Sequence, residues 1–134
     1  MKKKYYKLLK LLIPIILILL VITGFNKIEK KDCEGAKNYA SNAYDYYRKS
    51  YRSDNLDDAQ YYAKKGMNES SSAEDESNNS DCDCDDAESS ASDAYSYGRK
   101  AYNSDNLEDS QYYIKKAISF SEAITSNAED CEEE

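Results

Sequence analysis

The 134-residue chain contains no histidine and no tryptophan, and it has only one proline, four glycines and two phenylalanines. Without histidine it cannot build a histidine-containing catalytic triad, a His-ligated metal site or a histidine pH switch. The sequence also shows no glycine-rich phosphate loop, no nucleophile–base pairing and no metal-ligand spacing. We therefore expect no enzymatic activity, no cofactor and no bound metal ion.

Basic residues are scarce as well. The chain has 18 Lys and Arg against 26 Asp and Glu, a formal net charge of -8. This balance argues against a nucleic-acid partner, because such binding needs Lys and Arg to neutralise phosphates. The charge is also uneven: residues 1–31 carry eight Lys and one Glu, whereas residues 32–134 carry ten Lys and Arg and 25 acids. A basic segment thus precedes a strongly acidic domain.

Residues 1–25 hold the long apolar run of the sequence. Five lysines lie among the first ten residues, and an apolar run from Leu11 to Ile22 follows. A basic start before an apolar run is typical of an export signal. Counted from Leu8, residues 8–25 approach the length of a membrane-spanning helix, with Lys10 able to reach the headgroups. Residues 26–32 then form a Lys-rich linker.

Two outcomes are open for this segment. In the first it remains a single-pass membrane anchor, with a cytoplasmic N-terminus and residues 26–134 outside the cytoplasmic membrane. In the second it is cleaved after Thr23 or Gly24, which leaves a secreted or periplasmic protein. The sequence has no A-x-A cleavage pair here, which favours the anchor.

The acidic part of the chain is an internal duplication. A shift of 51 residues aligns Cys33–Ser80 with Cys84–Cys131 without gaps and gives 21 identities over 48 positions. Self-similarity of this kind indicates one supersecondary unit used twice. We expect the units to occupy residues 33–82 and 83–134, the second of them including an acidic tail.

Each unit is predicted to be an antiparallel pair of α-helices. Small and apolar residues recur at alternating spacings of three and four, which is the period of a helix-packing seam. A short polar turn at Ser53-Asp54-Asn55 separates the two helices, and Asp54 or Asn55 can cap the second. The predicted seams contain Ala36, Ala40, Ala43, Tyr47 and Ser50; Leu56, Ala59, Ala63, Gly66, Ser70 and Ala73; Ala87, Ala91, Ala94, Gly98 and Ala101; and Leu107, Ser110, Ile114, Ala117, Ser121, Ile124 and Ala128.

The fold class is therefore all-α, with two tandem αα-hairpins arranged as a small helical bundle or as a two-unit helical repeat. Residues 68–80 contain Ala73 as their one apolar residue, amid Ser, Asn and acids. We expect this end of the first hairpin to fray.

The turn of the second unit resembles that of a tetratricopeptide repeat. The resemblance is carried by Ala101-Tyr102-Asn103-Ser104-Asp105-Asn106-Leu107, followed by Tyr113 and Ala117. The period differs, since these units recur every 51 residues and tetratricopeptide units every 34, and the closing proline is absent. We carry over no ligand-binding residues from that family.

The four cysteines lie at the ends of the two units. Pairing across the open end of each hairpin predicts the disulfides Cys33–Cys82 and Cys84–Cys131. Each would close a loop of about 50 residues, worth ~4 kcal/mol in the chain-entropy model. An exported location supplies the oxidising environment. The rival interpretation is a thiolate metal site around Cys82-Asp83-Cys84, which the absence of histidine and the export signal disfavour.

Tyr61 and Tyr112 are equivalent residues on the outer faces of their helices. They either pack the hairpins together or lie on the surface, and the functional hypothesis is that they contact a partner. The basic pairs beside the seams, such as Lys64-Lys65 and Lys115-Lys116, are expected to form surface ion pairs. We expect a non-enzymatic protein–protein interaction module outside the cytoplasmic membrane. The alternative is an acidic cation-binding or stress-type secreted protein, with weak divalent-ion binding on its acidic surface.

Overall fold

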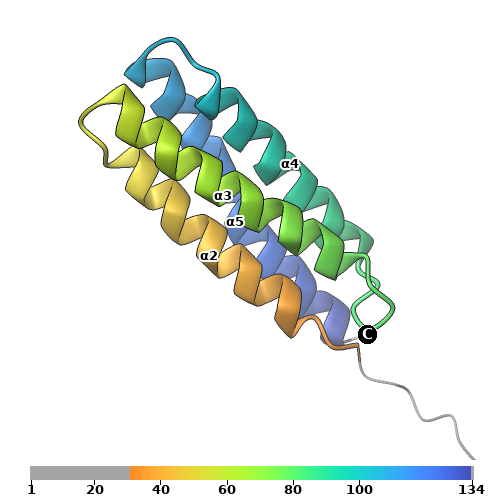
Figure 1. Cartoon of the computed structure of the whole chain (residues 1–134). Coiled ribbons are helices and arrows are strands. Elements are labelled where there is room, and N and C mark those ends of the chain that lie inside the picture. The colour runs from red at the N-terminus through yellow and green to blue at the C-terminus, as the bar shows by residue number, and fades with distance from the viewer. Residues whose placement is uncertain (1–30, 134) are drawn as a thin grey trace, which may run out of the picture.

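The computed structural model describes residues 31–133, and this part of the chain folds into four α-helices (Figure 1). They are α2 (Glu34–Tyr51), α3 (Leu56–Ser77), α4 (Asp85–Tyr102) and α5 (Leu107–Glu133). The helices run up and down in chain order, and α5 packs back against α2, which closes a bundle. The all-α prediction is confirmed for these residues, and of the two arrangements considered the chain adopts the bundle.

The predicted signal or anchor, residues 1–25, lies outside the described residues. Within residues 31–133, none of the helices is long and apolar enough to cross a membrane. Residue 31 and the C-terminal end of α5 lie at one end of the bundle, beside the 78–84 loop (Figure 1). We call this the disulfide end, and the opposite end, formed by residues 51–56 and 102–107, the turn end.

The two turns at the turn end are built alike. The side chain of Asn55 accepts a hydrogen bond from the backbone N–H of Asp58 at 2.9 Å and caps α3. Asn106 makes the equivalent bond to Asp109 at 2.8 Å at the start of α5. Each cap satisfies an amide that a helix N-terminus leaves unpaired, so a turn of four residues suffices to reverse the chain.

The core of the bundle consists mostly of small side chains. The predicted seam positions are all buried except Leu56 and Leu107, which are half-buried. Three large side chains are fully buried among the alanines, serines and glycines, and these are Tyr47, Ile114 and Ile124. Small residues let the helices approach closely, but they bury little apolar area per residue. Covalent cross-links therefore matter more here than in a leucine-rich bundle.

Tyr47 fills the centre of the bundle. Its ring lies against Gly66 of α3 and Gly98 of α4, where an added Cβ would come within 2.6 Å and 2.3 Å of Tyr47 atoms. Its hydroxyl donates to the backbone carbonyl of Ala94 at 3.0 Å and lies 3.2 Å from the hydroxyl of Ser70. The glycines are thus required by the close approach of one aromatic ring.

Most of residues 68–80, where we expected the helix to fray, are helical in the structure. Helix α3 continues to Ser77, with Ser70, Ala73 and Ser77 buried. The hydroxyl of Ser70 donates to the carbonyl of Gly66 at 3.0 Å, and that of Ser77 donates to Ala73 at 2.7 Å. Because these hydroxyls bond within their own helix, serine serves here as a small core residue.

The two repeat units are joined by contacts at both ends of the bundle. At the turn end, the amide of Gln60 donates to the carbonyl of Ser104 at 2.8 Å, and its repeat equivalent Gln111 donates to the carbonyl of Tyr51 at 3.0 Å. At the disulfide end, Lys37 of α2 forms a 2.8 Å ion pair with Glu132 of α5. These bonds connect the first unit to the second, so the described residues form one bundle.

Candidate interaction surface

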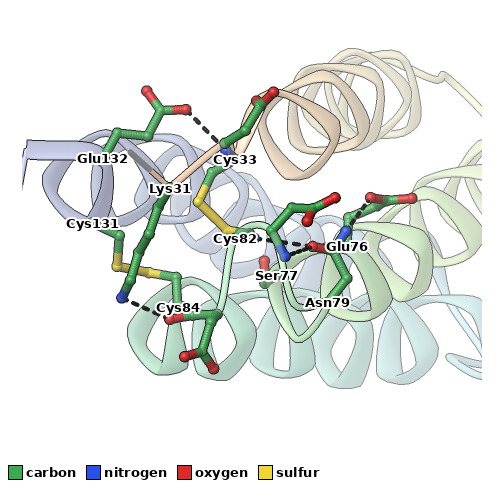
Figure 2. Close-up of a disulfide and its surroundings, with 12 residues drawn as sticks. Lys31, Cys33, Glu76, Ser77, Asn79, Cys82, Cys84, Cys131 and Glu132 are labelled. Atoms are coloured by element: carbon green, nitrogen blue, oxygen red, sulfur yellow. Dashed lines mark hydrogen bonds between the residues drawn. A yellow bond between two sulfur atoms is a disulfide. The ribbon is translucent and has the colours of Figure 1, made fainter. Parts of the chain in front are cut away.

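The disulfide end carries both predicted cross-links (Figure 2). Cys33 is bonded to Cys82, and Cys84 is bonded to Cys131. The pairing prediction is confirmed, and no cysteine among the described residues is left as a free thiolate ligand. In the first unit residues 78–84 leave the helix and carry Cys82 back to Cys33, whereas in the second unit Cys131 lies on α5 itself.

The acidic segment 81–86 connects the two disulfides. Lys31 donates a 3.0 Å hydrogen bond to the carbonyl of Asp83, a residue with a left-handed φ of 46° (Figure 2). A shallow cavity of about 400 Å³ lies beside this loop and is lined by Lys31, Asp83, Cys84, Asp85, Asp86, Asn127, Asp130 and Cys131. Across residues 31–133, no group of three or more acidic or cysteine side chains is arranged to hold a metal ion.

Tyr61 and Tyr112 lie on the surface. Their side chains are 54% and 57% exposed, the highest values among the exposed large hydrophobic residues. Neither packs one hairpin on the other, so of the two structural alternatives the surface position is the one observed. Each ring contacts the next tyrosine edge-on, with centroids 5.1 Å apart for Tyr61 and Tyr62 and 5.3 Å apart for Tyr112 and Tyr113.

Lysine ammonium groups lie over these exposed rings. In the first unit the ammonium of Lys65 lies 4.7 Å from the Tyr61 centroid and 5.4 Å from that of Tyr46, across the α2–α3 boundary. Lys49 lies 5.2 Å from the same Tyr46 ring. Cation–π attraction of this kind contributes roughly 0.5–1 kcal/mol at an exposed site. We call Tyr46, Lys49, Tyr61 and Lys65 the first Tyr–Lys cluster.

The second unit repeats the arrangement on α4 and α5. Lys116 lies 5.0 Å from the Tyr112 centroid and 5.2 Å from that of Tyr97, and Lys100 lies 4.6 Å from Tyr97. We call Tyr97, Lys100, Tyr112 and Lys116 the second Tyr–Lys cluster. All three lysine–tyrosine contacts recur in both copies, which indicates that the spacing of the residues places each ammonium over its rings.

The surface ion pairs expected for the basic residues of the turn end are largely replaced by these ring contacts. Arg48 lies 5.3 Å from the Tyr44 centroid, and Lys64 lies 5.8 Å from that of Tyr102. The ion pair observed within residues 31–133 is Lys37–Glu132, at the other end. The expectation was wrong, because these ammonium groups lie over tyrosine rings of their own helix and of the neighbouring helix.

The two clusters face opposite sides of the bundle. Helices α2 and α3 are neighbours, as are α4 and α5, while α2 and α4 face each other diagonally (Figure 1). A surface that bridges α2 and α3 therefore lies opposite one that bridges α4 and α5. Sequence reasoning selected Tyr61 and Tyr112 but missed the other six members, although their identity between the two units was a visible signal.

The clusters lie in the less acidic half of the molecule. Residues 43–68 and 94–119, which form the turn half, carry nine Lys and Arg against seven Asp and Glu. The remaining residues of the range 32–134, the disulfide half, carry one Lys against 18 acids. Within residues 32–134 the bundle is thus a polarised rod, in which the turn half carries a small excess of positive charge and the disulfide half a large excess of negative charge.

Comparison with known protein families, with curated proteins and with solved structures finds no match to this chain.

Proposed function

We propose that this protein is a non-enzymatic protein–protein interaction module that works outside the cytoplasmic membrane. The observation that carries the proposal is the pair of Tyr–Lys clusters. Exposed tyrosines are enriched at protein interfaces, where a large rigid ring contributes contact area and its hydroxyl a hydrogen bond. The same arrangement occurs in both copies of the repeat, which supports a role for the surface itself.

Its location outside the cytoplasm is supported by two features. The disulfides Cys33–Cys82 and Cys84–Cys131 require an oxidising environment to form and persist. The basic and apolar residues 1–25 provide an export signal, which retains the protein on the membrane through residues 8–25 if it is not cleaved. In the retained form the anchor is joined to the bundle at the disulfide end, where the described part of the chain begins.

Affinity capture with a matched pair of variants tests the role. The purified protein is used as bait in wild-type form and as the Tyr61→Ala/Tyr112→Ala variant, with Tyr39→Ala/Tyr51→Ala as the control. Both variants remove two exposed tyrosines, but only the first removes cluster members. We expect the first variant to lose the specific partner and the control to retain it. Retention by both variants, or equal loss from both, would contradict the proposal.

The alternative, an acidic cation-binding protein, is supported by the excess of carboxylates in the disulfide half. Calcium, a hard cation, prefers six to eight oxygen ligands, which such a surface could supply only loosely. Isothermal titration calorimetry with calcium decides between the two functions. Binding of one or more ions with a defined stoichiometry would favour the alternative, and the absence of heat would remove it.

A further inference from the structure

We propose that each Tyr–Lys cluster binds an acidic peptide segment of the partner protein, so that one molecule bridges two such segments from opposite faces of the bundle. The inference rests on the proposed function and names the chemistry of the partner. It is carried by the contacts within the clusters, by their place in the polarised rod and by their position on opposite faces.

The two lysines of each cluster share one tyrosine ring. Lys49 and Lys65 both lie within 5.4 Å of the centre of the Tyr46 ring, and Lys100 and Lys116 lie within 5.2 Å of that of Tyr97. An ammonium group has three donors, and ring contact leaves donors free for a carboxylate. Two neighbouring ammonium groups therefore suit a segment with two or more adjacent carboxylates.

The exposed ring supplies the second part of the contact. Tyr61 and Tyr112 are more than half exposed, so each ring offers free surface beside its lysine. The aliphatic part of a glutamate side chain can pack on that surface while its carboxylate reaches the ammonium. Lys65 and Lys116 carry a full positive charge at neutral pH, and the side-chain interactions with Tyr61 and Tyr112 raise their pKa values further.

Charge complementarity selects an acidic segment over a basic or neutral one. The disulfide half repels anions, and the clusters occupy the half in which Lys and Arg outnumber the acids. Screening at physiological salt reduces interactions beyond about 8 Å, so the distant carboxylates oppose binding weakly. The nearest acids of the two helix N-termini, Asp58 and Asp109, are already hydrogen-bonded to their capping asparagines.

The two clusters differ at the edge nearest the disulfide half. Beside the first cluster, Glu69 accepts a 3.2 Å hydrogen bond from Asn42 and places a carboxylate one helical turn from Lys65. At the equivalent position of the second unit, Phe120 stacks on Tyr97 with centroids 5.5 Å apart. A carboxylate opposes an acidic ligand and a phenyl ring does not. The second cluster is therefore the tighter of the two sites.

Because the clusters lie on opposite faces of the bundle, one molecule can hold two acidic segments at the same time. A short acidic segment on the α2–α3 face cannot reach the α4–α5 face around the bundle. Two occupied clusters therefore hold two separate segments, and the molecule acts as a bridge between partner molecules or between distant segments of one partner.

Calorimetry with a defined probe tests the inference. A capped hexaglutamate peptide is titrated into the purified protein, with hexaglutamine as the neutral control and a polyphosphate of equal charge as the competing anion. We expect two hexaglutamate molecules to bind with unequal affinities that fall as salt is raised. Hexaglutamine is expected not to bind, and polyphosphate is expected to bind less tightly than hexaglutamate.

Three variants assign the sites. Lys116→Gln is expected to remove the tighter site and Lys65→Gln the weaker one, while the double variant loses about tenfold or more in affinity. Lys64→Gln/Lys115→Gln is the matched control, since it removes the same charge from the residues next in sequence but outside the clusters. Thermal melting by circular dichroism verifies that all the variants remain folded.

Several outcomes would overturn the inference. A single site in the wild type, an equal loss in the Lys64/Lys115 control or tighter binding of polyphosphate would each do so. If hexaglutamate does not bind but the Tyr61/Tyr112 variant still loses its captured partner, the acidic chemistry is wrong and the interaction role stands. Failure of both experiments removes both proposals.

Discussion

Tyr47 and Gly98 occupy the same position in the two repeats, and in the folded protein the ring of one fills the space left by the other. A Cβ on Gly98 would lie 2.3 Å from the Tyr47 hydroxyl oxygen, too close without movement of the ring. Gly66 of α3 also lies against the Tyr47 ring, and the residue at its equivalent position in the second unit is Ala117. The duplicated units have thus become complementary in the core.

Gly98→Ala is expected to destabilise the protein by about 1–3 kcal/mol, although alanine is the better helix former. The reason is overpacking against the Tyr47 ring. In a Tyr47→Ala background the same change should cost nothing or stabilise by up to about 1 kcal/mol, because the ring is gone. Urea unfolding of the wild type, the two single variants and the double variant measures the coupling free energy between residues 47 and 98. Equal effects in both backgrounds would show that the two residues do not compete for space.

Tyr47 also predicts how stability depends on pH. Burial raises the pKa of its hydroxyl well above the usual value of 10.0, and the contact with the Ser70 hydroxyl offsets only part of this. The folded state therefore keeps a proton that the unfolded chain releases above pH 10, so stability falls as pH rises beyond that value. Tyr47→Phe should cost about 1 kcal/mol at neutral pH and show a shallower alkaline loss. Urea unfolding between pH 8 and 12 gives the free energy of unfolding as a function of pH for the wild type and for Tyr47→Phe. Equal slopes for the two proteins would contradict the assignment to Tyr47.

The two disulfides are expected to be reduced one after the other. Cys33 and Cys82 are fully buried, whereas Cys131 is only half-buried, and thiol–disulfide exchange needs access to a sulfur. Limiting reductant should therefore open Cys84–Cys131 first, as seen by alkylation and peptide mass spectrometry. The loops are similar, with separations of 49 and 47 residues, so loss of either bond should cost a similar ~4 kcal/mol. Simultaneous opening would contradict the order.

Two buried serines beside the turn end form a matched pair of tests. The hydroxyl of Ser50 donates to the carbonyl of Ala59 at 2.6 Å, whereas the buried hydroxyl of Ser110 has no hydrogen-bond partner within residues 31–133. Ser110 is the repeat equivalent of Ala59, so alanine already fits that position. Ser110→Ala should raise the free energy of unfolding by about 1 kcal/mol and Ser50→Ala should lower it by a similar amount. A loss of stability in Ser110→Ala would contradict the assignment.

Helical period and cysteine position sufficed to predict much of the fold. The seam residues and both disulfides follow from spacing alone, because a bundle buries one stripe of each helix and an antiparallel hairpin brings its ends together. The match between Tyr47 and Gly98 did not follow, since seam rules treat each position separately. Its signal was present, since three large seam residues stand at positions that are small in the other unit, namely Tyr47 (Gly98), Ile114 (Ala63) and Ile124 (Ala73).

The candidate site was only half predicted. Exposure of Tyr61 and Tyr112 followed from their angle on the helix, which the period determines. The placement of Lys65 and Lys116 over those rings did not, because it depends on how neighbouring helices align and on side-chain rotamers. The membrane anchor or cleaved signal at residues 1–25 stays a prediction from the composition of that segment.

Nuclear magnetic resonance of the ¹⁵N-labelled protein, titrated with hexaglutamate, shows residue by residue where an acidic peptide binds the bundle. We expect chemical-shift changes at amides around Tyr46 and Tyr61 and around Tyr97 and Tyr112, and the second group should saturate at the lower peptide concentration. Changes confined to the disulfide half, or to one repeat alone, would contradict this expectation.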